Sequence, residues 1–541
     1  MPSPRVDTND PALRVIAITN VIVSWMGLSM AHVHANDRPD QILFRRQAVQ
    51  RMVFDQDQAI RLASFSPAKV VALDLMHPDL VPMEHRANSL IQSDKLVIAA
   101  PGNHASRSVR WVGGFNVFAT YDVEIGELLG SGTVGIQFRD SDSNDSLTAD
   151  VLFQDGMAHG IRWRTTVDGV KNAEYSWPLA EDPTTNESFI LRVQMVAVGA
   201  NVFLESRGRS SLIGYVDLPE QVELRDKRRM ARYQFAMAAS LEPKARATIS
   251  GATAAITPGT GQADIRAMTD EFGNPLLDDS RLWFTVTTRG RALPHPAQGV
   301  FSLNPSVFDL RFEGLIVFDA GDGLLRNELA SHLFRDSQTG QWRGWTTGFS
   351  ALGNQKRGDS KAILAVWSDR DPRRGFSIMR SRAIGIEGAH EDPHCVYDAD
   401  AQKWRLLLCE RAGKYQAAMW ESDEWDRGYA RLAGPVEVDS TGTLIQTFGD
   451  QRYVLFGSAD RRVYIRNYPD LTAAGELRIE LPPWNDQHGT RIWPNVIPLP
   501  DGYPAPYIAL MMDRANFPGM PTRNWTYGAL YLYHGTVSDE E

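Results

Sequence analysis

The chain has 541 residues, of which 43% are hydrophobic, with a mean hydropathy of −0.29 and a formal net charge of −10. This length and composition predict a globular protein of two or more domains. A nucleic-acid-binding surface needs an excess of Lys and Arg, so the acidic balance argues against a nucleic-acid partner.

The first 90 residues contain one apolar run, VIAITNVIVSWMGLSMAHVHA at 15–35, followed by short polar pieces that we expect to be helical or irregular. A signal peptide requires a positively charged start and an uninterrupted apolar core. Acidic residues balance the basic ones before this run, and polar residues interrupt it. We therefore favour a soluble cytoplasmic protein, with export by a signal peptide as the alternative, and we expect no membrane span.

Short runs of alternating apolar and polar residues fill 91–245, with Gly, Asp, Asn and Ser between them. Examples are FNVFATYDVEI at 115–125 and IRWRTTVDG at 161–169. A period of two is typical of strands with one buried face, and the tripeptides VDG and QDG indicate hairpin turns. So many antiparallel strands predict a jelly-roll β-sandwich. In its order of strands this domain resembles the concanavalin and laminin-G types.

From residue 250 onwards one layout repeats five times: a polar cluster, an apolar strand, a turn, and a strand that begins near an aromatic residue. The aromatic anchors are Trp283, Trp342, Trp404, Tyr453 and Tyr507. Their spacing, together with several strands in each unit, is typical of β-propeller blades. We therefore predict an all-β protein in which a five-bladed β-propeller at 250–541 follows the sandwich. A second sandwich is the alternative.

The stretch AHEDPHCVYDADAQKWRLLLCE at 389–410 contains the spacing H-E-x-x-H. This spacing makes a zinc site only on a helix, where His390 and His394 would share one face. Pro393 opposes a helix, because proline lacks the N–H and clashes with the preceding turn. In an extended chain the two histidines lie ~13 Å apart, at ~3.3 Å per residue. We therefore expect no zinc peptidase and no catalytic metal, while a structural calcium ion stays open.

The innermost strands of a propeller surround its axis, so polar residues at their starts are expected to face one funnel. These predicted starts are Asp264, Glu328, Glu391 with Asp392, Thr441 and Arg491. Carboxylates that converge in a desolvated site raise one another's pKa. Cleavage of a glycosidic bond uses such a pair, one carboxyl protonated and one ionised.

Carboxylates in blades one and three, the latter in the string E-D-P, resemble those of the five-bladed β-propeller glycoside hydrolases, which include arabinofuranosidases, xylosidases and fructosidases. The resemblance covers 250–541 and implies a cofactor-free glycosidase that degrades an oligo- or polysaccharide. It implies Asp264 as base or nucleophile and Asp392 as the residue that tunes pKa and holds substrate. For the general acid it favours Glu410, which follows a cysteine, with Glu437, Glu391 and Glu421 as alternatives.

Further polar and aromatic residues near the predicted inner strands are expected to bind the carbohydrate. They are Glu328, His332, His390, Glu391, His394, Arg491 and Trp493. The histidines would hydrogen-bond to sugar hydroxyls and Trp493 would stack on a sugar ring. A non-catalytic carbohydrate-binding protein, and a glycosyl or fructosyl transferase on the same scaffold, remain alternatives.

Overall fold

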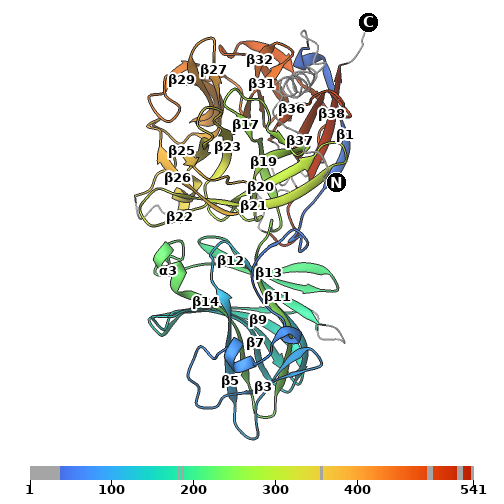
Figure 1. Ribbon diagram of the computed structural model, residues 1–541, viewed down its shortest axis with the longest axis vertical. Helices are drawn as coiled ribbons and strands as arrows, with labels where there is room; N and C mark the ends of the chain where they lie inside the picture. The colour runs from blue at the N-terminus through green and yellow to red at the C-terminus, as the bar shows by residue number, and fades with distance from the viewer. Residues whose placement is uncertain are drawn as a thin grey trace, which may run out of the picture.

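The structure is a computed structural model that describes residues 37–180, 183, 188–353, 358–483, 491–513, 515–520 and 528–537. This part of the chain is all-β and forms an N-terminal jelly-roll sandwich and a five-bladed propeller (Figure 1). The apolar run at 15–35 lies outside the described residues. None of the helices in the described ranges has the length and apolar character needed to cross a bilayer.

The sandwich consists of two packed sheets. The six-stranded sheet has the order β10 (Val170–Pro178), β9 (Met157–Val167), β8 (Ser146–Gln154), β7 (Gly132–Asp140), β14 (Tyr233–Leu241) and β5 (Ser106–Gly114). The eight-stranded sheet has the order β13 (Arg209–Asp217), β12 (Gly199–Ser206), β11 (Phe189–Met195), β6 (Thr120–Leu129), β15 (Arg246–Ile256), β4 (Lys95–Ala99) and β3 (Asn88–Gln92), with β2 (Ile60–Phe65) also on β15. The predicted alternation is present: Val134, Ile136 and Phe138 of β7 are fully buried between polar or small neighbours.

The propeller has five blades of four antiparallel strands. Blade one is β16 (Gln262–Ala267), β19 (Arg281–Thr288), β20 (Ala297–Asn304) and β21 (Asp309–Asp319), and blade two is β23 (Leu329–Arg335), β24 (Trp342–Thr347), β25 (Ile363–Ser368) and β26 (Gly375–Ala383). Blade three is β27 (Glu391–Asp398), β28 (Lys403–Ala412), β29 (Lys414–Ser422) and β30 (Ala430–Ala433), and blade four is β31 (Thr441–Phe448), β32 (Gln451–Gly457), β33 (Val463–Asn467) and β34 (Ala473–Glu476). Blade five is β36 (Val496–Pro498), β37 (Tyr507–Met512), β38 (Leu530–Val537) and β1 (Ile42–Gln50).

Shorter elements connect these strands. They are η1 (Pro39–Gln41), η2 (Pro67–Lys69), α2 (Leu73–Met76), α3 (Lys227–Arg232), η3 (Phe349–Gly353), β17 (Thr269–Asp270), β18 (Leu277–Asp278), β22 (Leu325–Arg326) and β35 (Arg478–Ile479). The outer strands β21 and β26 pair in parallel, so blades one and two share one continuous sheet. All five predicted aromatic anchors lie on the second strand of their blade, which confirms the repeat.

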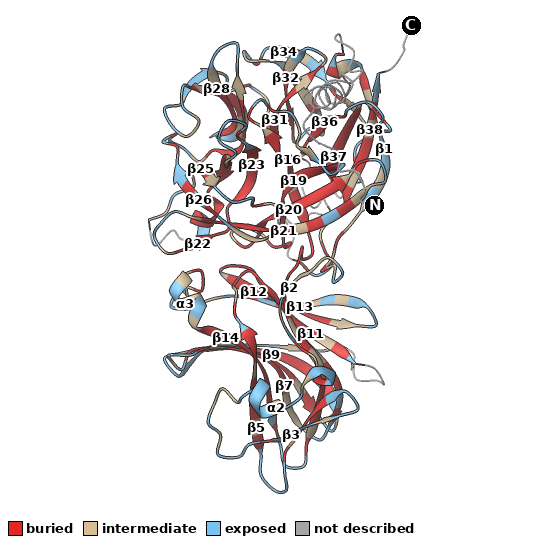
Figure 2. Cartoon of the chain, in the orientation of Figure 1, coloured by how far each residue is buried: buried red, intermediate tan, exposed pale blue. Residues whose placement is uncertain are grey.

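The inner strands surround the axis, and each contacts the next blade. Blade five meets blade one through Asn495, whose Oδ1 accepts a hydrogen bond from the Ala267 N–H at 3.2 Å. Buried residues follow the strands of both domains, and exposed ones gather on loops and outer strands (Figure 2). The ring is therefore closed around a packed centre.

The outer strand of blade five comes from the opposite end of the chain. β1 runs antiparallel to β38, with Ile42 opposite Val537 and Gln50 opposite Leu530, and it also pairs in parallel with β35. The helical or irregular structure expected for this segment is thus wrong over Ile42–Gln50. The reason is that its partner strand lies almost 490 residues away, where local sequence gives no signal. The whole sandwich is inserted between this strand and blade one.

We predict that β1 contributes strongly to propeller stability. Phe44 is fully buried in a core shared by blades four and five, so Phe44→Ala should lower the free energy of unfolding by roughly 3–5 kcal/mol. Val49, on the same strand, is 55% exposed, and Val49→Ala should cost less than about 0.5 kcal/mol. Urea denaturation followed by tryptophan fluorescence measures both, and equal losses would contradict a buried closing strand.

Candidate active site at the propeller hub

Four inner strands begin with the same backbone irregularity. In each, the pairing register shifts directly after the start of the strand. The bulged residues are Asp264, Ala330, Asp392 and Gly442, with φ of 51°, 55°, 59° and 62°. Such a bulge re-aims one side chain, and a positive φ costs a non-glycine residue about 1–3 kcal/mol. Asp264 and Asp392 therefore occupy equivalent positions in blades one and three.

Asp392 is buried and held by blade four. Its Oδ2 accepts hydrogen bonds from the Gly442 N–H at 3.0 Å and the Thr441 hydroxyl at 3.1 Å, and the Cys409 Sγ lies 3.7 Å away. Its backbone carbonyl accepts a hydrogen bond from Arg266 Nη2 at 3.0 Å. Groups from blades one and four therefore hold Asp392 in place.

Asp264 is half-buried and lies on the same side of the hub. The link between the two acids is Arg266, which is fully buried two residues further along β16. Burial lowers the pKa of Arg266 to about 10, and the negative charges of Asp392 and Asp264 oppose this effect. Both carboxylates therefore lie within electrostatic reach of one guanidinium group, as the sequence predicted for converging acids.

Glu391 lies beside Asp392 and is buried with a cation. Lys361, from the loop before β25, donates from Nζ to Glu391 Oε2 at 2.7 Å and to the Tyr415 hydroxyl at 3.0 Å. Burial and the charge of Asp392 raise the pKa of Glu391 to about 7, although Lys361 acts in the opposite direction. Glu391 is thus a carboxyl group that gains and loses its proton near neutral pH.

Arg491 reaches the same region from blade five. It forms a bidentate ion pair with Asp439, at 3.0 and 2.7 Å, and its guanidinium lies 5.5 Å from the centre of the Tyr415 ring. Although burial works against it, the charges of Asp439, Glu391 and Asp392 raise the pKa of Arg491. The inner strand of blade five begins at Val496, so Arg491 precedes the strand instead of starting it.

Beneath the acids, two histidines fill the axis. The rings of His332 and His394 stack at 4.0 Å, and both side chains are buried. His332 Nδ1 accepts a hydrogen bond from the Cys395 N–H at 3.2 Å, and His394 Nδ1 accepts one from the Ile445 N–H at 3.4 Å. Burial lowers the pKa of His332 to about 3 and that of His394 well below its ordinary value. Both are therefore neutral at pH 7 and join neighbouring blades.

Trp493 also belongs to the packed hub. Its Nε1 donates to the Ile265 carbonyl at 2.6 Å, and its ring lies 4.9 Å from the guanidinium carbon of Arg266. Only 3% of the residue is exposed. Trp493 thus joins blade five to blade one and has little free surface for a sugar ring.

Two other predicted residues, His390 and Glu328, are committed to local contacts. His390 Nε2 lies 2.7 Å from the Glu387 carbonyl. The buried carboxylate of Glu328 accepts hydrogen bonds from the N–H and hydroxyl of Ser350, at 2.9 and 2.6 Å, and burial raises its pKa. Neither group forms a hydrogen bond with Asp392.

Glu410 points away from the hub acids. Its neighbour Cys409 faces Asp392, and successive strand residues face opposite sides. The Glu410 carboxylate instead accepts two hydrogen bonds from Arg431, at 3.0 and 2.6 Å, and one from Trp420 at 2.8 Å. Of the alternatives, Glu421 is paired with Arg405 and Glu437 is exposed.

The H-E-x-x-H stretch is not helical. Glu391–Asp398 is a strand, as predicted, and His390 and His394 have separate partners. Across the ranges that the structure describes, three or more His, Cys, Asp or Glu side chains nowhere gather as a metal site would require. The structural calcium ion remains an expectation from sequence.

Three residues of this region have no local signal in the sequence: Lys361, Tyr415 and Asp439. They lie in or beside loops, and their approach to Glu391 and Arg491 depends on the arrangement of the blades. The sequence alone does not show that these three residues lie close together.

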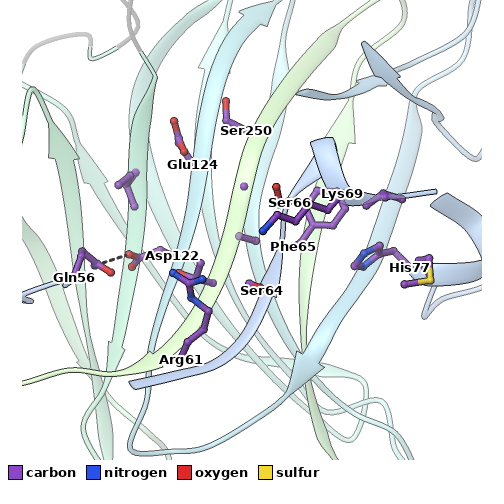
Figure 3. A pocket seen from close by; sticks show the side chains of 16 residues that line it. Gln56, Arg61, Ser64, Phe65, Ser66, Lys69, His77, Asp122, Glu124 and Ser250 are labelled. Atoms are coloured by element: carbon purple, nitrogen blue, oxygen red, sulfur yellow. Dashed lines mark hydrogen bonds between the residues drawn. The ribbon is translucent and has the colours of Figure 1, made fainter. Parts of the chain in front are cut away.

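The sandwich carries a cavity of about 550 Å³ on the outer face of the eight-stranded sheet. Figure 3 shows Asp122 and Glu124 of β6 and Ser250 of β15 along it, with Arg61 of β2 facing them. Gln56 donates to Asp122 at 3.2 Å. Asp122 is also bound in a bidentate ion pair by Arg192, at 2.8 and 2.9 Å.

No protein-family model matches the chain, and no curated protein matches it. Among solved structures, a thermostable family-43 glycoside hydrolase is 12% identical, with 52% of this chain and 95% of that chain covered and a TM-score of 0.35. The GH43_1 enzyme from Xanthomonas citri is 12% identical, with 50% and 87% covered and a TM-score of 0.34. SCLam, a non-specific endo-β-1,3(4)-glucanase from family GH16, is 8% identical, with 41% and 98% covered and a TM-score of 0.27. Such identities and TM-scores assign the chain to no family.

We predict that the hub loses stability in acid. The folded pKa of His332, about 3, lies below its ordinary value of 6.5, so its stabilising contribution is complete above pH 6.5 and declines as the pH falls towards 3. The slope is up to ~1.4 kcal/mol per pH unit. In urea unfolding between pH 4 and 7, His332→Gln should flatten this dependence, whereas His159→Gln, at an exposed site, should not. Equal slopes in all three proteins would contradict a neutral buried histidine.

Proposed function

We propose that the protein is a glycoside hydrolase that uses paired carboxyl groups at the propeller hub. One observation carries the proposal. Two aspartates at equivalent bulges lie within reach of Arg266, beside a glutamate whose pKa is raised to about 7. An ionised carboxylate next to a protonated carboxyl is the pair that glycosidic cleavage requires.

We assign the proton transfer to the leaving oxygen to Glu391, because it is the carboxyl of this group that titrates near neutral pH. Asp264, which is half-buried, acts as base or nucleophile. Asp392 is held by hydrogen bonds from blade four, and its charge raises the pKa of Glu391. Lys361 moderates that pKa, and the anomeric form of the product distinguishes a base from a nucleophile.

A second candidate is carbohydrate binding without cleavage, which the sandwich cavity favours. Carboxylates, hydroxyls and an amide line it, and these groups suit sugar hydroxyls. Glycosyl or fructosyl transfer at the hub would use the same carboxyl groups and is distinguished by products formed at high sugar concentration.

We predict that the hub acids, and not Glu410, govern turnover. In a screen of aryl furanosides and pyranosides, Asp264→Asn and Glu391→Gln should each lower kcat/KM by roughly 10²–10⁴-fold. Glu410→Gln is a matched control, since it removes a similarly buried carboxylate that is committed to Arg431, and it should change kcat/KM only a few-fold. Loss of activity in Glu410→Gln with full activity in Glu391→Gln would overturn the assignment. Sugar binding without cleavage by any protein would favour the second candidate.

We also predict a basic limit to activity near pH 7, where Glu391 loses its proton. Lys361 lowers the pKa of Glu391, so Lys361→Met should raise that pKa. The fall in kcat/KM on the basic side, the basic limb of the pH profile, should then move to higher pH. The dependence of kcat/KM on pH measures this. A limb that stays in place or moves to lower pH would show that another group is titrating.

A further inference from the structure

We propose that the outer face of the six-stranded sheet binds an acidic polysaccharide, a sugar chain that carries carboxylate or sulfate groups. This inference rests on the proposed function only in taking a sugar chain as the ligand. The face lies on the sandwich, away from the hub, and is built from side chains that the proposed reaction does not use.

Four arginines converge on this face. Arg162 and Arg164 alternate along β9 with the buried Ile161, Trp163 and Thr165, so they point away from the core. Arg107 comes from β5 and reaches across the sheet to the Gln137 Oε1, at 3.4 Å. Arg139, two residues after Gln137 on β7, shares its side of the sheet.

Two of these arginines share one carboxylate. Arg162 and Arg164 both donate to the Oδ2 of the buried Asp150, at 3.2 and 2.7 Å. Burial lowers the pKa of Arg107, and the positive charges of Arg164 and Arg139 lower it further, while Asp150 opposes them. The acid on the next strand, Glu174, is paired with Lys171 at 3.7 Å. The face is thus strongly positive on a chain whose net charge is −10.

The guanidinium groups also have unused donors. In the described part of the chain, the Nε atoms of Arg107, Arg162 and Arg164 are buried without a hydrogen-bond partner. The side chains of Arg162 and Arg164 are 25% and 34% exposed, so their outer nitrogens reach solvent. The outer guanidinium nitrogens, in a positive field, match the paired oxygens of a carboxylate or sulfate group, which a guanidinium binds bidentately.

The face offers room for a chain. Leu80 and Val81 cover Ala236 and Ala238 on β14, whereas Arg107, Arg162 and Arg164 are partly exposed. Arg107 also lines a cavity of about 840 Å³ at one end of the same face. Glu84, Glu242 and Ser240 line that cavity too, and these acceptors suit neutral sugar hydroxyls. An extended chain therefore fits with its acidic groups over the arginines and an uncharged part in the cavity.

The test uses the full chain carrying Asp264→Asn to suppress cleavage. Electrophoresis in gels containing polygalacturonate, dextran sulfate or uncharged dextran measures retention at 0.15 M salt, and titration gives Kd. We expect retention by polygalacturonate if carboxylates are the ligand and by dextran sulfate if sulfates are, and none by dextran. The triple variant Arg107→Gln, Arg162→Gln, Arg164→Gln should bind at least tenfold more weakly.

Two controls separate recognition from charge and folding. Arg45→Gln, Arg335→Gln and Arg370→Gln together remove the same charge from exposed sites on the propeller and should change Kd less than twofold. Arg107→Gln with Arg139→Gln leaves both hydrogen-bonded partners of Asp150 in place and should still weaken binding several-fold, with an unchanged unfolding midpoint.

The proposal is overturned if neither polyanion retains the parent protein, or if the face and control triples bind equally. Equal retention by duplex DNA would also overturn it, since that result indicates attraction to any polyanion. The face variants should leave turnover of a neutral aryl glycoside unchanged. If no glycoside is cleaved but polyanion binding depends on the arginines, the proposed glycosidase function at the hub fails and the proposed polysaccharide-binding face stands.

Discussion

The guanidinium group of Arg266 is the contact on which the hub depends. From blade one it donates to the carbonyls of Asp392 in blade three and Thr443 in blade four, and it packs on Trp493 of blade five. A fully buried cation is costly unless nearby groups compensate it. Here the compensation comes from backbone carbonyls and from the charges of Asp392 and Asp264. The two aspartates are therefore part of the packing of the ring as well as candidates for chemistry.

The hub places the carboxyl groups of Asp392 and Glu391 in different environments. Asp392 receives donors from blade four, whereas Glu391, one residue earlier, faces Lys361 in a desolvated site beside a negative neighbour. The two adjacent acids thus have different surroundings, and burial together with the charge of Asp392 raises the pKa of Glu391 to about 7. The bulge at Asp392 makes this possible, because it turns the side chain without ending the strand.

The sequence predicts those features of the fold that depend on a local pattern of residues. The alternation in the sandwich, the aromatic anchors and the aspartates near the starts of inner strands follow from patterns that repeat along the chain, whereas the bulges at these aspartates have no such signal. The outer strand β1 has no such local signal, because it pairs with β38 at the other end of the chain. The resemblance favours Glu410 over Glu391 because Glu410 follows a cysteine, but the sequence does not show which face of β28 meets the hub. That depends on the register that sets Glu391 opposite Cys409. Lys361 approaches Glu391 only through the packing of blades two and three.

The insertion of the sandwich has a mechanical consequence. The chain enters it from β1 and leaves it into β16, so two crossings join it to the ring. The junction is also packed. Arg291 and His295 both contact Asp217, at 2.5 and 3.0 Å, and Arg289 donates to the Met195 carbonyl at 3.1 Å. A domain tied in this way turns little against the propeller. A sugar chain held on the sandwich would therefore be presented to the hub in a restricted range of orientations, which raises its effective concentration there without any new contact at the acids.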